Sequence, residues 1–256
     1  MFSKKGKLLR RLGVLALLVG ASALVLSACK FTTIYGVGTI RGNGIMVDSE
    51  LSASGDIKRI ELYKVSATLN ISAEKSDKVT YKIDENLRKH LNVEINGDLL
   101  KISSKSKKTL GINKWGTNKI TFNIGTEMLK EISIYSGAVV NGTGTFNAET
   151  FTADIVGAAT VNLKLNTDKI ILNVAGASDI NFSGTTKIFE IKSDGVVDVE
   201  CKGLIADNVL INSKGTGSIE VYADVNLTVN GSGVCSIKYW GNAKLGGSFR
   251  GLITKG

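Results

Sequence analysis

Three aspartates in the second half of the chain, Asp154, Asp194 and Asp198, are the side chains best placed to do chemistry. The alternation of apolar and polar residues around them puts each at an outward or corner position of a strand. Carboxylates gathered on such a face can hold Ca²⁺ or act as general acid and base. The equivalent positions elsewhere in this region are Asn173, Lys192, Asn212 and Asn230. The acidic group therefore does not continue, and a solvated face that deters strand pairing explains it as well.

Other catalytic or metal-binding arrangements are missing from the sequence. His90 is the single histidine, which excludes histidine-based triads and multi-histidine metal sites. No Gly-x-Ser-x-Gly, Gly-x-x-x-x-Gly-Lys or Cys-x-x-Cys motif occurs. We therefore expect no catalytic residue, no metal and no cofactor.

Two aromatic residues, Tyr222 and Trp240, also point outward by alternation, and Trp115 lies in a predicted loop. Exposed aromatic rings present an apolar face with a polar tip, which suits the faces of sugars. The three aspartates and these two aromatic residues form the candidate ligand-binding surface. Its expected ligand is a glycan or a protein.

The N-terminal block ends in Leu26-Ser27-Ala28-Cys29 and is built like a secretory signal, with a basic start over residues 4–11 and an apolar run over residues 12–26. Its last four residues resemble the lipobox of bacterial lipoproteins, in which cleavage before the cysteine leaves it as a lipidated N-terminus. The resemblance implies a signal peptide over residues 1–28 and lipidation of Cys29. It also implies a membrane-anchored protein of the cell envelope that faces the periplasm or the exterior.

Two other interpretations of this block stay open. An ordinary secretory signal has the same basic start and apolar stretch but requires no cysteine at the cut site. A transmembrane anchor needs about 20 apolar residues, whereas this run has about 15.

The positive charge of the chain is largely a property of the same block. The 256 residues carry a formal net charge of +9, but five of the 32 Lys and Arg residues, and no Asp or Glu, lie within residues 1–28. The remainder has 27 basic against 23 acidic side chains, a net charge of +4. A nucleic-acid partner thus loses its electrostatic support, and none is expected.

The second half of the chain repeats one motif six times. Each copy is an alternating apolar stretch that ends in a glycine, and successive glycines are 20, 19, 19, 20 and 18 residues apart: Gly137, Gly157, Gly176, Gly195, Gly215 and Gly233. Four residues after most of them stands a β-branched residue, but the first copy has Asn141 there. Units this short bury their apolar faces only by stacking on one another.

A period near 20, short strands and no helical pattern predict a right-handed parallel β-helix, an all-β solenoid with coils of about 19–20 residues that follows an N-terminal strand-rich section. Equivalent residues would stack about 4.8 Å apart, with the glycines at a corner. An antiparallel sandwich with chance periodicity is the alternative, while the framework of a leucine-rich repeat is missing. An open end of the helix would leave strand edges for contact with a second copy, a homo-oligomer.

The predicted register separates Cys201 from Cys235 by two coils, roughly 9 to 10 Å. A disulfide needs Cα atoms within about 7 Å. We therefore expect two buried free thiols.

The first half of the chain also consists mainly of predicted strands. A short helix is expected over residues 84–91 with Asp84 as its cap, and a hairpin is expected across Asn96-Gly97-Asp98. The chain thus divides into a signal peptide (1–28), a Gly-rich tether (29–44), an N-terminal β-rich section (45–128) and the repeats (129–256).

The order of these elements resembles the putative auto-transporter adhesin, head GIN domain family. The similarity covers about residues 45–256 and is carried by a Gly-rich start, a strand pair, the segment 84–87 (Asp-Glu-Asn-Leu), the segment 96–102 (Asn-Gly-Asp-Leu-Leu-Lys-Ile) and the entry 129–132 (Leu-Lys-Glu-Ile) into Ser-Gly-containing coils. It implies a β-helical, exported protein that is often a lipoprotein. One departure is Ile124-Gly125-Thr126, where family members commonly have a proline.

These features predict a lipid-anchored cell-surface protein that acts as an adhesin or binding module without catalytic activity. Its expected partners are the membrane, through the N-terminal lipid, and a surface ligand. The alternative is a polysaccharide-active β-helix enzyme, a lyase or hydrolase that uses the outward carboxylates. A purely structural envelope protein is a third possibility.

Overall fold

The computed structural model describes residues 39–53, 55–111 and 119–256. The chain divides into two compact units, residues 1–39 and 40–256, and nearly all described residues belong to the second. The signal block with Cys29, the tether up to residue 38 and Trp115 lie outside the described residues.

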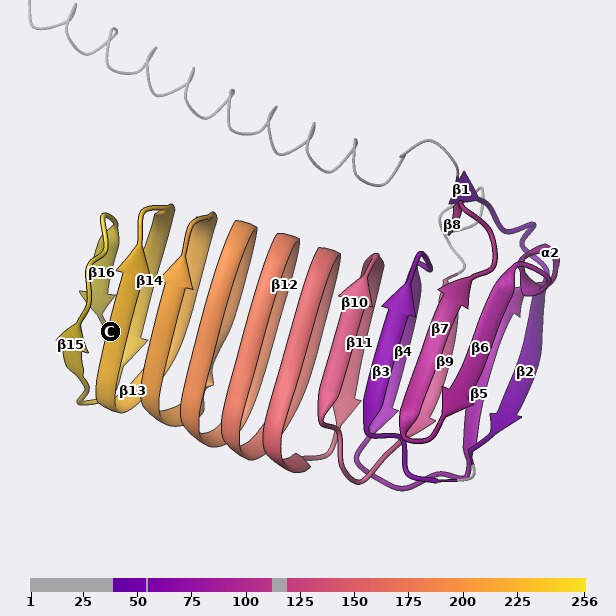
Figure 1. Ribbon diagram of the computed structural model, residues 1–256, viewed down its shortest axis with the longest axis horizontal. Coiled ribbons are helices and arrows are strands. Elements are labelled where there is room, and N and C mark those ends of the chain that lie inside the picture. The colour runs from indigo at the N-terminus through magenta and orange to yellow at the C-terminus, as the bar shows by residue number, and fades with distance from the viewer. Residues whose placement is uncertain (1–38, 54, 112–118) are drawn as a thin grey trace, which may run out of the picture. The chain divides into compact units, whose positions relative to one another are not determined.

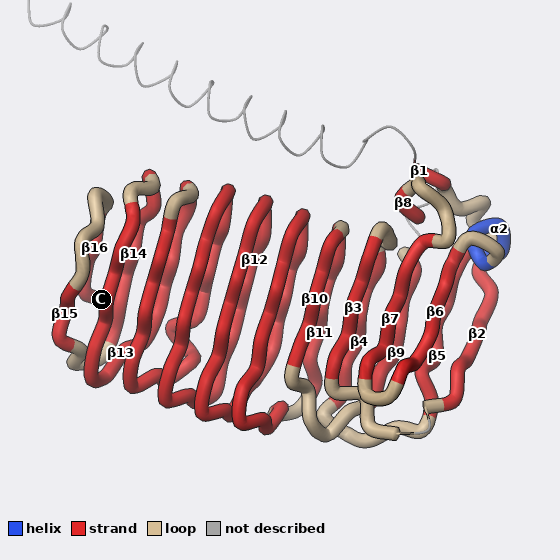
Figure 2. Tube along the Cα trace, in the orientation of Figure 1, coloured by secondary structure: helices blue, strands red, loops and turns tan. Residues whose placement is uncertain are grey.

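Strands make up most of the second unit, and the helix drawn in it, α2, is short (Figures 1 and 2). The first half contains β1 (Thr39–Ile40), β2 (Met46–Ser52), β3 (Arg59–Tyr63), β4 (Ala67–Ser72), β5 (Lys78–Asp84), α2 (Glu85–Arg88), β6 (Leu91–Asn96), β7 (Leu99–Ser104), β8 (Thr109–Leu110) and β9 (Ile120–Gly125). The repeat region contains β10 (Glu131–Tyr135), β11 (Gly137–Thr143), β12 (Phe146–Ser213), β13 (Thr216–Gly231), β14 (Val234–Trp240), β15 (Lys244–Gly246) and β16 (Leu252–Lys255).

The strands form one 14-stranded sheet, apart from the small β1–β8 pair. The main order is β2-β5-β9-β4-β11-β12-β10-β3-β7-β6, so that strands from the first half of the chain flank both sides of the repeat region. The pairs β2–β5, β5–β9 and β6–β7 are antiparallel, whereas β3–β7, β3–β10, β4–β9 and β4–β11 are parallel.

The prediction of a right-handed parallel β-helix is therefore wrong. The sheet has mixed strand order and mixed direction, and it curves round its core as a nearly closed barrel. The repeat specifies only which residues of successive copies lie opposite one another. It contains no information on the hairpins of the first half, which bring antiparallel strands into the same sheet.

Residues 18 to 20 positions apart lie opposite one another in the repeat region. Val199 pairs with Ile219, and Ile219 in turn pairs with Ile237, all in parallel. The strand β12 runs for 68 residues and bends at glycines with left-handed φ, among them Gly157 and Gly176. The stacking of equivalent positions that the sequence period predicts is thus present locally, within the mixed sheet.

The first copy is shifted by one residue from the predicted alignment. Gly137 pairs with Ala158, and Val140 pairs with Val161. The backbone of Ser136, not of Gly137, lies against Gly157. The β-branched position of the first copy is therefore occupied by Val140, and Asn141, which the sequence alignment placed there, pairs with Asn162.

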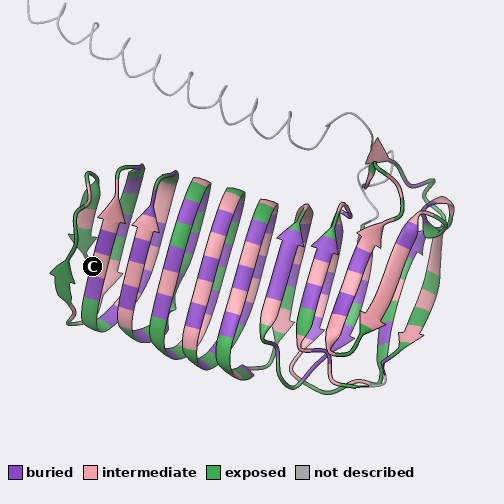
Figure 3. Ribbon diagram, in the orientation of Figure 1, coloured by how far each residue is buried: buried purple, intermediate pink, exposed green. Residues whose placement is uncertain are grey.

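Apolar side chains alternate into a single core, as the burial pattern along β12 shows (Figure 3). Phe182 is fully buried and lies 6.0 Å from Phe151 and 6.4 Å from Phe189, measured between ring centroids. Fully burying side chains of this size contributes about 1.5 to 3 kcal/mol each. The core is therefore the main source of stability.

The two cysteines lie at different positions of the repeat, as the register predicted. Cys201 pairs with Val221 and Cys235 with Gly217, and both residues are buried free thiols.

The first half confirms the predicted hairpin and corrects the predicted helix. The strands β6 and β7 pair in antiparallel fashion on either side of Gly97, whose φ is +63°. The helix α2 has only four residues, and Asp84 makes no side-chain cap. The Asp84 carboxylate instead accepts a hydrogen bond from the Gly44 nitrogen at 2.6 Å. Tertiary contact therefore overrides the local capping preference.

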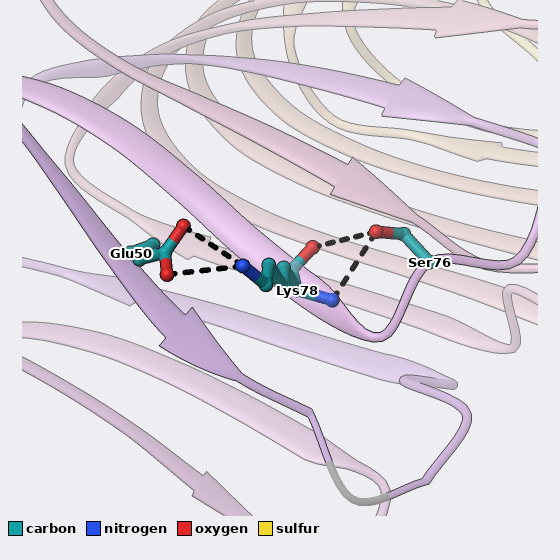
Figure 4. A network of polar contacts seen from close by, with 3 residues as sticks. All are labelled: Glu50, Ser76 and Lys78. Carbon is teal, nitrogen blue, oxygen red and sulfur yellow. Dashed lines mark hydrogen bonds and ion pairs between the residues drawn. The ribbon is translucent and has the colours of Figure 1, made fainter.

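Polar contacts also fasten the edge strand β2 to β5. The Lys78 Nζ donates to both carboxylate oxygens of Glu50, at 3.1 and 3.3 Å, and the Ser76 hydroxyl binds the Lys78 backbone at the turn (Figure 4). In the part of the chain that the structure describes, no helix is long and apolar enough to cross a membrane.

Candidate functional site

A surface groove of about 740 Å³ runs across the repeats, next to their glycine corner. It is lined by Tyr135, Asp154, Ile155, Val156, Asn173, Val174, Ala175, Lys192, Ser193, Asp194, Asn212, Ser213, Lys214, Asn230 and Gly231. Most of these residues occupy one of two positions in their repeat: either the third residue before the glycine or the residue directly before it. The groove is therefore built by stacking of equivalent positions, with each repeat contributing one step.

The residues three before the glycine form what we call the polar ladder: Asp154, Asn173, Lys192, Asn212 and Asn230. The Asn173 Nδ2 donates to the Asp154 Oδ1 at 2.6 Å, and the Asn230 Nδ2 donates to the Asn212 Oδ1 at 3.3 Å. The Asn230 Oδ1 accepts a further bond from the Ser248 nitrogen at 3.2 Å. These bonds hold the amide side chains in a fixed orientation along the groove.

The residues just before the glycine form a second row, the corner row: Val156, Ala175, Asp194 and Lys214. Tyr135 continues the corner row in the first copy, because Ile134 pairs with Ile155. The Tyr135 ring packs edge to face against the ring of Tyr63, with centroids 6.4 Å apart, and Tyr135 is 41% exposed. The corner row thus combines an aromatic ring, apolar groups and two opposite charges.

Strand periodicity explains why both rows face outward. Ile155, Val174 and Ser193 occupy the position between the two rows, and all three are buried. The inward serines pair with each other, since the Ser193 Oγ donates to the Ser213 Oγ at 2.9 Å. Side chains on either side of this inward position must therefore point away from the core.

Glycine is required at the corner because the backbones of successive repeats approach closely there. A Cβ on Gly176 would collide with the Gly157 carbonyl, and one on Gly195 would collide with the Gly176 carbonyl. The φ angles of these three residues, +147°, +130° and +124°, lie in the region that favours glycine. Close packing of the glycines therefore sets a regular, short spacing between successive residues of the corner row.

Several polar groups in the groove have no hydrogen-bond or ion-pair partner among the described residues. The side chains of Lys192, Asp194, Lys214 and Tyr135 make no hydrogen bond or ion pair with any residue that the structure describes. Some charged residues elsewhere on the repeats are paired, such as Lys169 with Glu190 and Lys187 with Asp168, both at 2.8 Å, whereas others, such as Lys164 and Asp179, have no partner among the described residues. The four side chains in the groove are thus available to form hydrogen bonds or ion pairs with a ligand.

The five predicted surface residues do not lie together. Asp154 and Asp194 line the groove. Asp198 lies three residues beyond the corner, where its Oδ1 accepts bonds from the Ser218 nitrogen at 3.1 Å and the Ser218 Oγ at 2.9 Å. Asp198 therefore links two neighbouring repeats and is not among the residues that line the groove.

The two predicted aromatic residues belong to another part of the sheet. Tyr222 pairs with Trp240, so the two residues are neighbours in register. The Lys238 Nζ lies 4.9 Å and the Lys202 Nζ 5.9 Å from the centroid of the Trp240 ring, within the range of cation–π contact. The Trp240 ring is therefore already in contact with cationic side chains of the protein itself.

The amide residues of the polar ladder were not among the residues predicted for the candidate surface. In the sequence, Asn173, Asn212 and Asn230 stand out only because they interrupt an acidic cluster. The signal that would have found the groove is the recurrence of a polar side chain at one fixed position, three residues before the glycine of each copy from Gly157 onward. Tyr135 gave no such signal, because the first copy is shifted by one residue.

The chemistry available in the groove is hydrogen bonding by amides, one phenol and balanced charges. Among the described residues, no group of three or more His, Cys, Asp or Glu side chains is arranged to hold a metal ion. Complete burial raises the pKa of the Cys201 thiol to about 12, but Cys201 is not among the residues that line the groove. The arrangement is suited to recognising a polar ligand.

Solved structures share the fold at low sequence identity. A putative adhesin from Bacteroides fragilis is 20% identical, with a TM-score of 0.74, and the match covers 84% of this chain and 99% of that chain. A putative adhesin from Parabacteroides merdae is 18% identical, with a TM-score of 0.60 and coverage of 86% and 100%. A putative lipid binding protein from Parabacteroides distasonis is 21% identical, with a TM-score of 0.61 and coverage of 85% and 99%. At these identities the likeness establishes the fold alone.

No curated protein matches the chain. The family model described as putative auto-transporter adhesin, head GIN domain, matches residues 59–243, which include the groove and both of its rows. The match confirms the resemblance seen in the order of the sequence elements. The chain belongs to the putative auto-transporter adhesin, head GIN domain family.

Proposed function

We propose that this protein is a lipid-anchored, non-catalytic binding module of the bacterial cell envelope, which acts as an adhesin through the groove. The observation that carries the proposal is the set of side chains that line the groove and make no hydrogen bond or ion pair with any described residue, Lys192, Asp194, Lys214 and Tyr135. Membership of a family described as adhesins supports a role in binding. All four side chains are exposed to solvent in the groove, so a ligand can reach them.

The polar ladder is oriented before any ligand binds. Its amides are held by the bonds from Asn173 to Asp154 and from Asn230 to Asn212, so little conformational entropy is lost when a ligand docks. Side chains that are oriented before binding give specificity at low cost.

Binding by the groove is tested on the full chain in detergent, probed with arrays of glycans, matrix proteins and lipid vesicles. Lipid vesicles are included because one structural neighbour is described as a lipid binding protein. We expect a ligand whose affinity falls at least tenfold in the double variant Tyr135→Ala with Asn212→Ala. The control Asn166→Ala changes an amide that pairs with Asn147 and Thr185 outside the groove. Equal binding by all three proteins would contradict the proposal.

Anchoring through Cys29 is proposed from the sequence block alone. Two or more acyl chains are needed for stable anchoring, since each buried CH₂ contributes about 0.8 kcal/mol. Cells that express the full chain are labelled with a palmitate analogue and fractionated. We expect wild type to be labelled and membrane-bound, and Cys29→Ala to be unlabelled. A Cys29→Ala protein that stays on the membrane, with no label in either form, would exclude lipidation.

The alternative function, a polysaccharide-active enzyme, has one supporting observation. Asp154 and Asp194 line the same groove as Lys192, so two carboxylates and a cation face a single bound chain. Screening of uronic-acid polymers with and without Ca²⁺ separates the two functions. Turnover that Asp194→Asn abolishes would establish the enzyme and exclude a binding-only role.

A further inference from the structure

We propose that the ligand of the groove is a neutral, linear glycan that lies along the polar ladder and is recognised by side chains alone. This inference rests on the proposed function of the groove and names the class of ligand that it takes.

The residues of the polar ladder are regularly spaced. Neighbouring strands of a sheet lie about 4.8 Å apart, so the four steps from Asp154 to Asn230 extend over roughly 19 Å. The residues lie in a line because each one occupies the same position of its repeat. A ligand that uses the whole ladder must be linear and must present polar groups at regular intervals.

The amides of the polar ladder keep hydrogen-bond capacity after their internal bonds are formed. A side-chain amide has two N–H donors and an oxygen with two lone pairs. The Asn173 Nδ2 uses one donor on Asp154, and the Asn212 Oδ1 uses one lone pair on Asn230. Each amide can therefore both donate to and accept from a ligand. Hydroxyl groups, which also do both, are the matching partner.

Positive and negative charges are balanced in the groove. The groove contains two carboxylates, Asp154 and Asp194, and two ammonium groups, Lys192 and Lys214. A polyanion would bring its charges close to the carboxylates, and a polycation would bring its charges close to the lysines. Since like charges brought together cost several kcal/mol, both classes are disfavoured relative to a neutral ligand.

The backbone of the groove is poorly suited to binding a peptide. Extended peptides commonly bind by adding a strand to a free sheet edge. The strands that build the groove have no free edge: β10 pairs with β3 and β12, and β13 pairs with β12, β14 and β15. A peptide would lose its main-chain hydrogen bonds here, whereas a glycan does not need them.

Tyr135 and Val156 provide an apolar surface for the face of a sugar ring. Tyr135 is 41% and Val156 51% exposed, and both line the groove beside the ladder. Sugar rings have apolar C–H faces as well as hydroxyl edges. One side of a bound chain would therefore rest on the corner row while its hydroxyls reach the amides.

The test uses the full chain in detergent and titrates cello- and chito-oligosaccharides of increasing length, with heparin, polygalacturonate and phosphatidylglycerol vesicles as competitors. We expect affinity to rise with chain length and to be insensitive to ionic strength, because the ligand carries no charge. Loss of one hydrogen bond of about 1 kcal/mol lowers affinity about fivefold. Asn173→Ala and Asn212→Ala should each show this loss, and Asn166→Ala should show none.

The outcomes separate this inference from the proposed function. Tighter binding of heparin, vesicles or a protein, weakened by the same groove variants, would overturn the neutral glycan and keep the groove as a binding site. Ligand binding that no groove variant weakens would overturn both. Failure of every neutral oligosaccharide to bind would also overturn the inference. Thermal unfolding of each variant shows that the protein tested is folded.

Discussion

The side-chain amide of Asn173 donates a hydrogen bond of 2.6 Å to the carboxylate of Asp154, one repeat earlier in the chain. Both residues are half-buried at the edge of the groove. The contact is at once a rung between two repeats and a part of the candidate binding surface. A change at either residue therefore affects stability as well as recognition.

Asp154→Ala is expected to destabilise the protein by about 1 kcal/mol, because it leaves the Asn173 amide without its acceptor. Asp194→Ala is the matched control, since the Asp194 carboxylate has no partner among the residues described and surface changes of this kind stay within about 0.5 kcal/mol. Urea unfolding of both variants measures the difference. Equal losses would show that the Asn173–Asp154 bond does not stabilise the fold.

Gly176→Ala is expected to cost at least about 2 kcal/mol. Its Cβ would collide with the Gly157 carbonyl, and φ of +130° strains any residue with a side chain. Gly246→Ala is the control, because no atom lies within 4 Å of a Cβ placed there. Thermal unfolding should show a drop of about 4 to 8 °C for Gly176→Ala and almost none for Gly246→Ala. Similar shifts for both variants would exclude close backbone packing at the corner.

Phe182→Ala is expected to destabilise the protein by about 3 to 5 kcal/mol, since it empties a fully buried site that Phe151 and Phe189 share. Phe182→Leu should cost clearly less, because much of the volume is kept. Urea unfolding midpoints with an unchanged slope provide the measurement. A Phe182→Ala variant as stable as wild type would mean that the ring does not belong to the core.

The free energy of unfolding should fall as the pH rises from 9 to 12, because the Cys201 thiol loses its proton more readily in the unfolded chain. Burial raises the pKa of this thiol from its ordinary value of 9.0 to about 12. Above pH 9 the unfolded chain loses the proton while the folded protein keeps it, so each pH unit costs up to about 1.4 kcal/mol. Below pH 9 both states are protonated and the contribution is constant.

The measurement for Cys201 is the free energy of unfolding against pH, for wild type and Cys201→Ala. Other groups titrate in this range, but they are common to both proteins. The advantage of wild type over the variant should therefore shrink as the pH rises from 9 to 12. Parallel curves would indicate that the Cys201 thiol is solvated in the folded state.

The sequence by itself determined what depends on local spacing. The glycines at intervals of 18 to 20 residues decide which residues lie opposite, as Val199, Ile219 and Ile237 do. Alternation decides which side chains face inward, and it placed Asp154 and Asp194 on the outer side. The lipobox ending in Cys29 also belongs to the sequence alone, since it lies outside the described residues.

Only the tertiary structure decided what depends on strands far apart in the chain. β3 lies between β7 and β10, and β4 lies between β9 and β11, so the mixed sheet replaces the predicted β-helix. The one-residue shift that puts Tyr135 into the groove follows from how β10 and β11 pair with both halves of the chain. Local periodicity leaves such pairing open, because hydrogen bonds between distant strands depend on the packing of the whole core and not on any single repeat.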